Sequence, residues 1–309
     1  MKRATVTFSS AGVPCEAWFY TGTDNGSTTA AGRPVVVMAH GLAGTKDSGL
    51  EPFAERLAAA GLSVFAFDFR GFGGSSGTPR QSVSMTGQIE DYRAAMAAAA
   101  RRPGVDPRRI VLWGVSLSGG HVLVAGADRS DVAAIVSVTP MVNGMAAARF
   151  ALRHTPLGAV TRSSVAGTRS TVAKRLGNGP VLMPVVARPG EVGALTLDGY
   201  YDDYLSIAGP SWRNEVDAGL GSQLGRYRAD RSAARIGCPT LVQIADFDRG
   251  APPQAAAKAA FKARAEVRHY PCDHFGVYYG HDWFEPVVTH QIAFLHRHLA
   301  RAAAPVTSR

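Results

Sequence analysis

The chain has 309 residues, 46% of them hydrophobic, which is enough for a large buried core in an α/β protein. Its net charge of +9 comes from 33 basic and 24 acidic residues that are spread along the chain, so composition favours neither a nucleic-acid nor a membrane-surface protein. Three cysteines (Cys15, Cys238 and Cys272) are too few for a disulfide framework.

The chain shows no signal of export or of membrane insertion. Two basic residues near the N-terminus are not followed by the apolar segment of a secretory signal. No stretch reaches the ~18 consecutive apolar residues that a transmembrane helix needs. We therefore expect a cytoplasmic protein without a membrane span.

The first 140 residues alternate between strand and helix patterns. The predicted strands are residues 4–8, 15–20, 34–39, 62–69, 108–114 and 132–140, the first two forming an antiparallel hairpin. The predicted helices are residues 50–61, 84–102 and 116–127. Alternation at this spacing predicts a parallel sheet with crossover helices.

The alternation stops at Pro140 and resumes at Cys238. The predicted elements beyond that point are a strand at 238–248, a helix at 252–264, a strand at 265–270 and a helix at 283–301. The intervening segment has no clean period and is too long for a loop, so residues 141–236 are predicted to form a cap or lid. The core then comprises residues 1–140 and 237–301, with a flexible tail at 302–309.

A strand, the sequence Gly-x-Ser-x-small and a helix together form the pattern of a nucleophile elbow. Two registers fit, one with Ser116 at the apex and Ser118 at the small position, and one with Ser118 at the apex and Gly120 at the small position. Because the strand pattern ends at Gly114, we expect Ser116 to be the nucleophile and Ser118 to lie in the first helical turn. A serine-glycine turn without chemistry is the alternative.

Two further loops extend this pattern. Residues 35–49 (VVVMAHGLAGTKDSG) form a His-Gly loop, and residues 66–77 (AFDFRGFGGSSG) form an Asp-x-Arg-Gly-x-Gly-x-Ser loop. With them the chain resembles an α/β-hydrolase from about residue 34 to residue 300 outside the cap. It is similar to dienelactone-hydrolase-like, feruloyl-esterase-like and actinobacterial lysophospholipase-like members. The resemblance implies a mostly parallel eight-stranded sheet, helices on both faces and a cap inserted after the sixth strand.

A serine nucleophile needs an imidazole base that a carboxylate orients, and in this fold the three follow in the order Ser, Asp, His. Asp246 and Asp248 both follow the strand at 238–248. The family spacing of three residues after Ala245 favours Asp248, and Asp246 is the alternative. The family pattern Pro-x-x-His-Phe assigns the base to His274.

The other histidines and the nearby cysteine receive no catalytic role. His281 is a weaker candidate base, and His269 lies within a strand and is interpreted as structural. His40 is expected to brace its loop. Cys272 has no elbow around it and is interpreted as packed. Three histidines of the C-terminal helix are interpreted as solvated or structurally satisfied: His290, His296 and His298.

The resemblance also implies an oxyanion hole made by the backbone N–H groups of Leu42 and Leu117. We expect no metal, because His296 and His298 lack the spacing of ligands on one helix face. We expect no cofactor, because Ser76 stands where a dinucleotide fingerprint would need its last glycine.

These features predict a serine hydrolase that cleaves a carboxylic ester of a small to medium acyl substrate through an acyl-enzyme. A thioesterase or carbon–carbon hydrolase would use the same residues, and a non-catalytic binding protein on this fold is less favoured. The aromatic residues of 197–216 either line a pocket or pack the cap onto the core, and Asp202 and Asp203 would suit an amine substrate. The oligomeric state stays open, with a homodimer as one option.

Overall fold

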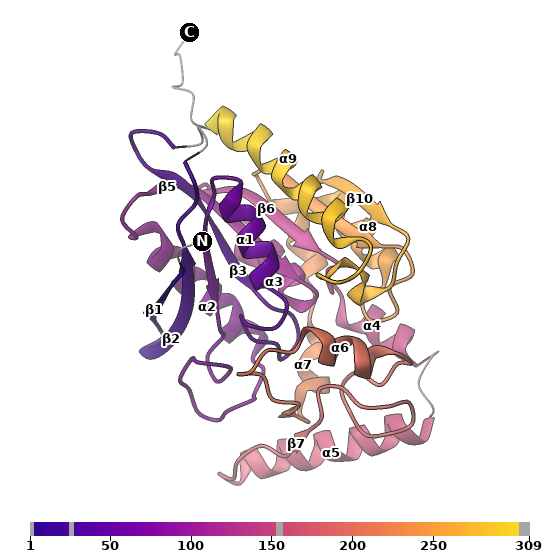
Figure 1. Ribbon diagram of the computed structural model, residues 1–309. Coiled ribbons are helices and arrows are strands. Elements are labelled where there is room, and N and C mark those ends of the chain that lie inside the picture. Colours follow the sequence, from indigo (N-terminus) through magenta and orange to yellow (C-terminus); the bar gives the residue numbers. More distant parts are fainter. Residues whose placement is uncertain (1–2, 25–27, 153–156, 303–309) are drawn as a thin grey trace.

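The computed structural model describes residues 3–24, 28–152 and 157–302 (Figure 1). Its centre is one eight-stranded sheet with the strand order β1-β2-β4-β3-β5-β6-β9-β10. The strands are β1 (Arg3–Ser10), β2 (Val13–Tyr20), β3 (Arg33–Ala39), β4 (Ser63–Phe67), β5 (Val105–Val115), β6 (Val132–Val138), β9 (Thr240–Ala245) and β10 (Glu266–Tyr270). The β1–β2 hairpin and the β2–β4 pair are antiparallel, and the other pairs are parallel. The predicted sheet is confirmed.

Helices cover both faces of this sheet, as the resemblance implies (Figure 1). They are α1 (Glu51–Ala59), α2 (Met85–Ala100), α3 (Leu117–Ala125), α8 (Pro253–Lys262) and α9 (Phe284–Ala302). Alternation along β9 shows how the faces are assigned. Val242 packs against alanines of α8, whereas the side chain of the next residue, Gln243, hydrogen-bonds to Val287 and Gln291 of α9. The inner strands β3, β4, β6 and β9 are buried almost throughout, on both faces, which explains their continuous apolar runs.

A long insertion separates β6 from β9 and lies in the lower part of Figure 1. Its elements are α4 (Gly144–Ala151), α5 (Leu157–Arg175), β7 (Leu182–Met183), α6 (Tyr200–Ile207), β8 (Val216–Asp217), α7 (Leu220–Arg226) and two short 3₁₀ helices, Ala229–Arg231 and Ala233–Arg235. Most of these elements are short, which is why the segment has no clean period. We call residues 141–236 the insertion.

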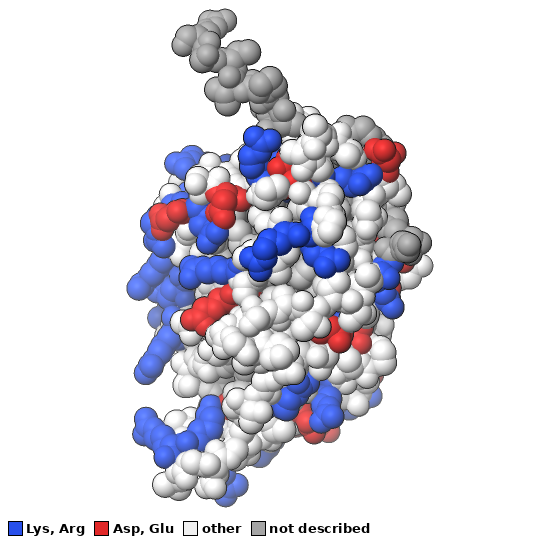
Figure 2. Space-filling model, turned by 90° about the vertical axis from the view of Figure 1, so that its left-hand side faces the viewer, with Lys and Arg blue, Asp and Glu red and all other residues white. Residues whose placement is uncertain are grey.

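The charged side chains on the surface match the basic composition. On the face drawn in Figure 2, Lys and Arg lie from the top of the molecule to the bottom, with acidic side chains among them.

Within the described ranges, no helix combines the length and the hydropathy needed to cross a bilayer. The tail predicted beyond Ala302 lies outside the described residues.

Candidate active site

Ser116 lies on the sharp turn between β5 and α3, with φ +57° and ψ −119°. A non-glycine residue rarely adopts a positive φ, and such strain persists only where the surroundings hold it. Two hydrogen bonds of 2.9 Å do so: Ser116 N–H donates to the Val138 carbonyl, and Met141 N–H donates to the Ser116 carbonyl. A Cβ on Gly114 would lie 2.2 Å from the carbonyl oxygen of Ser118, so the turn requires glycine there.

The two serines of the motif differ in access. Ser116 is half-buried, whereas Ser118 is fully buried in the first turn of α3. The Ser118 hydroxyl donates to the carbonyl of His40 and so ties α3 to the loop after β3. Of the two serines, Ser116 is the one with solvent access.

His274 and Asp248 come to Ser116 from the other end of the chain. His274 begins a 3₁₀ helix, His274–Val277, and its Nε2 lies 3.0 Å from Ser116 Oγ. Its Nδ1 lies 2.7 Å from Asp248 Oδ2. The other Asp248 oxygen accepts the N–H groups of Gly250 at 2.8 Å and Ala251 at 2.6 Å, which holds the carboxylate in place.

The alternative residues lie in different surroundings. Asp246 is bonded to His269, at 2.6 Å, and both side chains are more than one-third exposed. His281 caps a turn, its N–H donating to the Tyr278 carbonyl. The structure thus brings Asp248, and not Asp246, to His274.

The two buried histidines near Ser116 have opposite pKa shifts. Burial opposes a charge on His274, but the charge of Asp248, the hydrogen bond to it and the nearby Asp273 raise the pKa of His274 above its usual value. Burial, with repulsion from His274, lowers the pKa of His40 to about 3. His40 is therefore neutral at physiological pH, and its ring stacks on Tyr278.

The loop after β3 approaches Ser116 closely. A Cβ on Gly41 would lie 2.7 Å from Ser116 Cβ and 3.2 Å from its Oγ. The N–H groups of the next residue, Leu42, and of Leu117, at the start of α3, have no acceptor among the described residues. Both groups are therefore available as donors, and the positive end of α3 favours negative charge beside Ser116.

The sequence did not identify several residues that support the site through hydrogen bonds. Asp273 accepts the N–H groups of His274 (2.7 Å) and Arg249 (2.9 Å) and the hydroxyl of Tyr200 (2.9 Å). The Tyr204 hydroxyl donates to the Leu42 carbonyl at 2.9 Å. Only the density of aromatic residues in 197–216 pointed to these tyrosines, because their partners are distant in the chain.

Those aromatic residues pack the insertion onto the core. Tyr200 stacks on His274, and Tyr204 is stacked on Trp212 and meets Phe275 edge-on.

Burial and nearby carboxylates raise the pKa of Cys272 to about 12, which keeps its thiol protonated. In the described part of the chain, no three His, Cys, Asp or Glu residues are grouped to hold a metal ion.

Comparison with known proteins assigns the chain to a family. The model of the serine aminopeptidase S33 family, Hydrolase_4, matches residues 30–274. The chain belongs to this family. The S33 chain is 35% identical to the quorum-quenching protein AidA of Acinetobacter baumannii over 295 residues, 94% of each chain. It is 35% identical to the thiohydrolase aneE of Aspergillus aculeatus over 162 residues, 52% of this chain and 50% of that one.

A solved structure confirms the fold class of this S33 member. The α/β hydrolase GrgF from Penicillium sp. sh18 superposes with a TM-score of 0.79 at 21% identity, covering 97% of this chain and 100% of that one. The α/β-hydrolase fold that the loops at 35–49 and 66–77 predicted is therefore confirmed. Together, the family and its relatives identify the protein as an α/β hydrolase.

Proposed function

We propose that the protein is a serine hydrolase that cleaves a carboxylic ester through an acyl-enzyme. In this proposal Ser116 is the nucleophile and His274 is the general base. Asp248 orients the imidazole and stabilises its positive charge. One observation carries it. The hydroxyl, the imidazole and the carboxylate follow one another at 3.0 Å and 2.7 Å, in the order that activation of a serine requires.

The chemistry follows from those contacts. Ser116 Oγ attacks the acyl carbon as its proton passes to His274 Nε2, and the ester C–O bond then breaks as that proton moves to the leaving alcohol. Water attacks the acyl-enzyme in the same way, with His274 again taking and returning the proton. The raised pKa of His274 means that its protonated form, needed midway in each step, is stabilised by Asp248.

The N–H groups of Leu42 and Leu117 would hold the oxyanion of each tetrahedral intermediate. Each such donor is worth about 3 kcal/mol in the barrier when it is preorganised. The Tyr204–Leu42 bond supports this assignment, because it fixes the loop that presents one of the donors. We further propose that residues 141–236 act as the cap over Ser116 and select a small-molecule acyl substrate.

A thioester is the second candidate substrate class. It is favoured by the 35% identity to a thiohydrolase, which covers about half of this chain. The same residues would act, with a thiol as the leaving group. Oxyester and thioester substrates that share one acyl group, assayed side by side, distinguish the two.

The proposal is tested by labelling with a fluorophosphonate probe. We expect the wild-type protein and Ser118→Ala to be labelled and Ser116→Ala to be unlabelled. Ser118→Ala is the matched control, because it makes the same substitution two residues away. Labelling that survives Ser116→Ala would refute the assignment of the nucleophile, and so would wild-type protein that neither reacts nor hydrolyses any ester.

A further inference from the structure

Acidic residues are missing from one long stretch of the chain. Residues 132–190 contain seven lysines and arginines and no aspartate or glutamate, although basic residues are spread along the whole chain. Counts over the full sequence do not show this segregation of charge. Beyond the buried strand β6, the stretch supplies α4, α5 and β7, so most of it belongs to the insertion.

Exposed apolar side chains gather in the same stretch. Among the described residues, ten large apolar side chains are more than 40% exposed, and six of them lie between residues 145 and 182. Three of the six follow helix α5: Val165 is 52% exposed, Val172 49% and Leu176 73%. One exposed apolar residue is ordinary, but a group of them on one face indicates a contact surface.

These apolar side chains share one face of α5 with two arginines. The helix ends one residue before Leu176, whose N–H still donates to the Val172 carbonyl at 3.1 Å and so continues the turn. Intervals of three and four residues place five exposed side chains on one face, which we call the outer face of α5: Arg162, Val165, Arg169, Val172 and Leu176. Helix α5 lies at the lower end of the molecule in Figure 1, and Figure 2 shows Lys and Arg among uncharged side chains at that end.

The positive charge of the outer face is not neutralised by neighbouring carboxylates. Lys174 is the one cation of α5 that forms an ion pair with a described residue, Asp217. Arg162 donates to a backbone carbonyl, which leaves its charge uncompensated. The next acidic residue along the chain, Glu191, accepts the N–H of Arg188 at 2.8 Å. The outer face therefore combines apolar surface with uncompensated positive charge.

A groove of about 390 Å³ runs beside the outer face. Its walls carry both arginines of that face together with apolar side chains of α5 and of two later segments, among them Val165, Ala166, Val181 and Val192. Guanidinium groups bind phosphate oxygens in pairs of parallel hydrogen bonds. Two of them beside an apolar groove suit a molecule with an anionic head and an aliphatic chain.

We propose that the outer face of α5 binds the surface of an anionic lipid membrane. The apolar side chains enter the boundary between head groups and acyl chains, and the arginines bind lipid phosphates. Such binding lies in the plane of the surface and needs no membrane-spanning helix.

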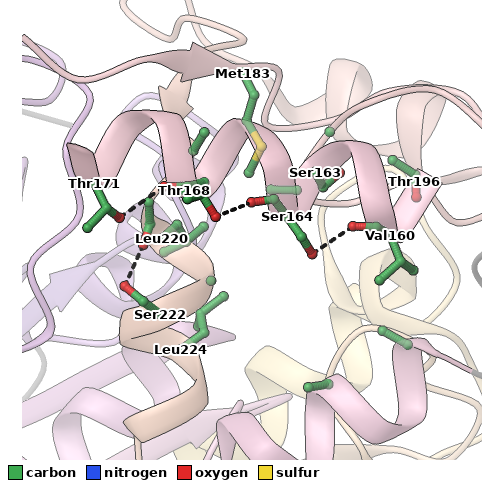
Figure 3. Close-up of a pocket in the computed structure, with 18 of the residues that line it drawn as sticks. Val160, Ser163, Ser164, Thr168, Thr171, Met183, Thr196, Leu220, Ser222 and Leu224 are labelled. Atoms are coloured by element: carbon green, nitrogen blue, oxygen red, sulfur yellow. Dashed lines mark hydrogen bonds between the residues drawn. The ribbon is translucent and has the colours of Figure 1, made fainter. Parts of the chain in front are cut away.

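Two other occupants fit this face less well. In a two-fold contact with a second copy of the chain, the same arginines would lie opposite one another and repel. A protein partner would form about one hydrogen bond per 100–200 Å² of interface. Beside the outer face, the hydroxyls of Ser164 and Thr168 already donate to carbonyls of their own helix, at 2.8 Å and 3.0 Å (Figure 3).

Sedimentation with sucrose-loaded vesicles tests the role of charge. At low salt we expect the protein to bind phosphatidylglycerol vesicles and not phosphatidylcholine vesicles. Arg162→Gln combined with Arg169→Gln should weaken binding about 30-fold, and lysine at both positions should retain most of it. The matched control makes the same charge change at two exposed arginines at the other end of the fold, Arg93→Gln with Arg101→Gln on α2 and its C-cap, and should bind like the wild type. No binding by the wild type, equal binding to both lipids, or an equal loss in the control would overturn the proposal.

Val172→Ser combined with Leu176→Ser tests the apolar contribution. We expect this variant to bind at least tenfold more weakly than the wild type. In about 0.5 M salt its deficit should persist while that of the arginine variant shrinks, because salt screens exposed charges. Phe261→Ser, which removes an 85% exposed ring from α8, is the control and should leave binding unchanged. A loss in Phe261→Ser as large as in the α5 variant contradicts the proposal, and circular dichroism and Tm check that all variants are folded.

Further measurements separate lipid from the other occupants. Without vesicles, analytical ultracentrifugation should show the same state of association for the wild type and for the glutamine variant of Arg162 and Arg169. A dimer that this variant dissociates assigns the face to a second copy, and poly-glutamate that binds as tightly as the vesicles assigns it to an acidic polypeptide; either result overturns the proposal. Ser116→Ala should bind vesicles like the wild type, so the outcome does not depend on the proposed function.

Discussion

Lys46→Met should destabilise the protein strongly, because Lys46 neutralises a buried carboxylate behind the loop that carries Leu42. The Lys46 ammonium lies 2.6 Å from Asp68 Oδ2 and 2.6 Å from Glu16 Oε1. The Lys46 side chain is 3% exposed and that of Asp68 is 0% exposed. Lys46 N–H also donates to Asp68 Oδ1 at 2.6 Å, so the pair joins the loop to the end of β4.

Removing one partner of a buried ion pair costs about 3–5 kcal/mol, because the other charge is left without compensation. The entropy of unfolding is about 2.1 cal/mol/K per residue, or about 0.65 kcal/mol/K for this chain of 309 residues. The Tm of Lys46→Met should therefore fall by about 5–8 °C. Differential scanning calorimetry measures that shift directly.

The shift should also depend on pH. Burial already raises the pKa of Asp68 beside Lys46, and without the ammonium it rises further. The folded variant then binds a proton more tightly than the unfolded chain, so its stability increases as pH falls. The loss of Tm should be larger at about pH 8 than at about pH 5.

An exposed ion pair supplies the control. Arg235 lies 2.8 Å from Asp128, with side chains 52% and 65% exposed, and Arg235→Met should change stability by less than about 1 kcal/mol. A Tm loss in Lys46→Met no larger than in this control, or one that is the same at both pH values, would refute the reasoning.

Three further predictions concern catalysis of ester hydrolysis. Asp248→Asn should lower kcat about 10⁴-fold and move the acid limb of the pH profile to lower pH, since the carboxylate raises the pKa of His274; an unmoved limb contradicts this. Tyr204→Phe removes the hydrogen bond to the Leu42 carbonyl and should lower kcat about fivefold to tenfold with KM little changed. A wild-type kcat in steady-state kinetics would exclude a role of Tyr204 in positioning this loop. Gly41→Ala should lower turnover more than tenfold, because its Cβ would lie 2.7 Å from that of the nucleophile; fluorophosphonate labelling at the wild-type rate would argue against such crowding.

Local patterns in the sequence located most of the strands, and the family resemblance supplied the eight-stranded sheet and the order of the candidate residues. The apolar runs of the inner parallel strands reflect burial on both faces, so continuous hydrophobic character between turn residues was enough to locate them. The positive φ of Ser116 and the close approach at Gly114 are likewise consequences of one short motif. The spacing from Ala245 favoured Asp248 over Asp246, and the structure brings Asp248 to His274.

Tertiary structure decided what depends on contacts between distant segments. The bond from Tyr204 to Leu42 joins residues 162 positions apart, and no local pattern encodes such a pairing. Asp273 resembled any polar loop residue until folding brought Tyr200 and Arg249 to it. A cavity of about 640 Å³ in the insertion is the clearest case (Figure 3). Residues of α4, α5 and α7 and of the segments between them line it, and no one of these segments encloses it alone.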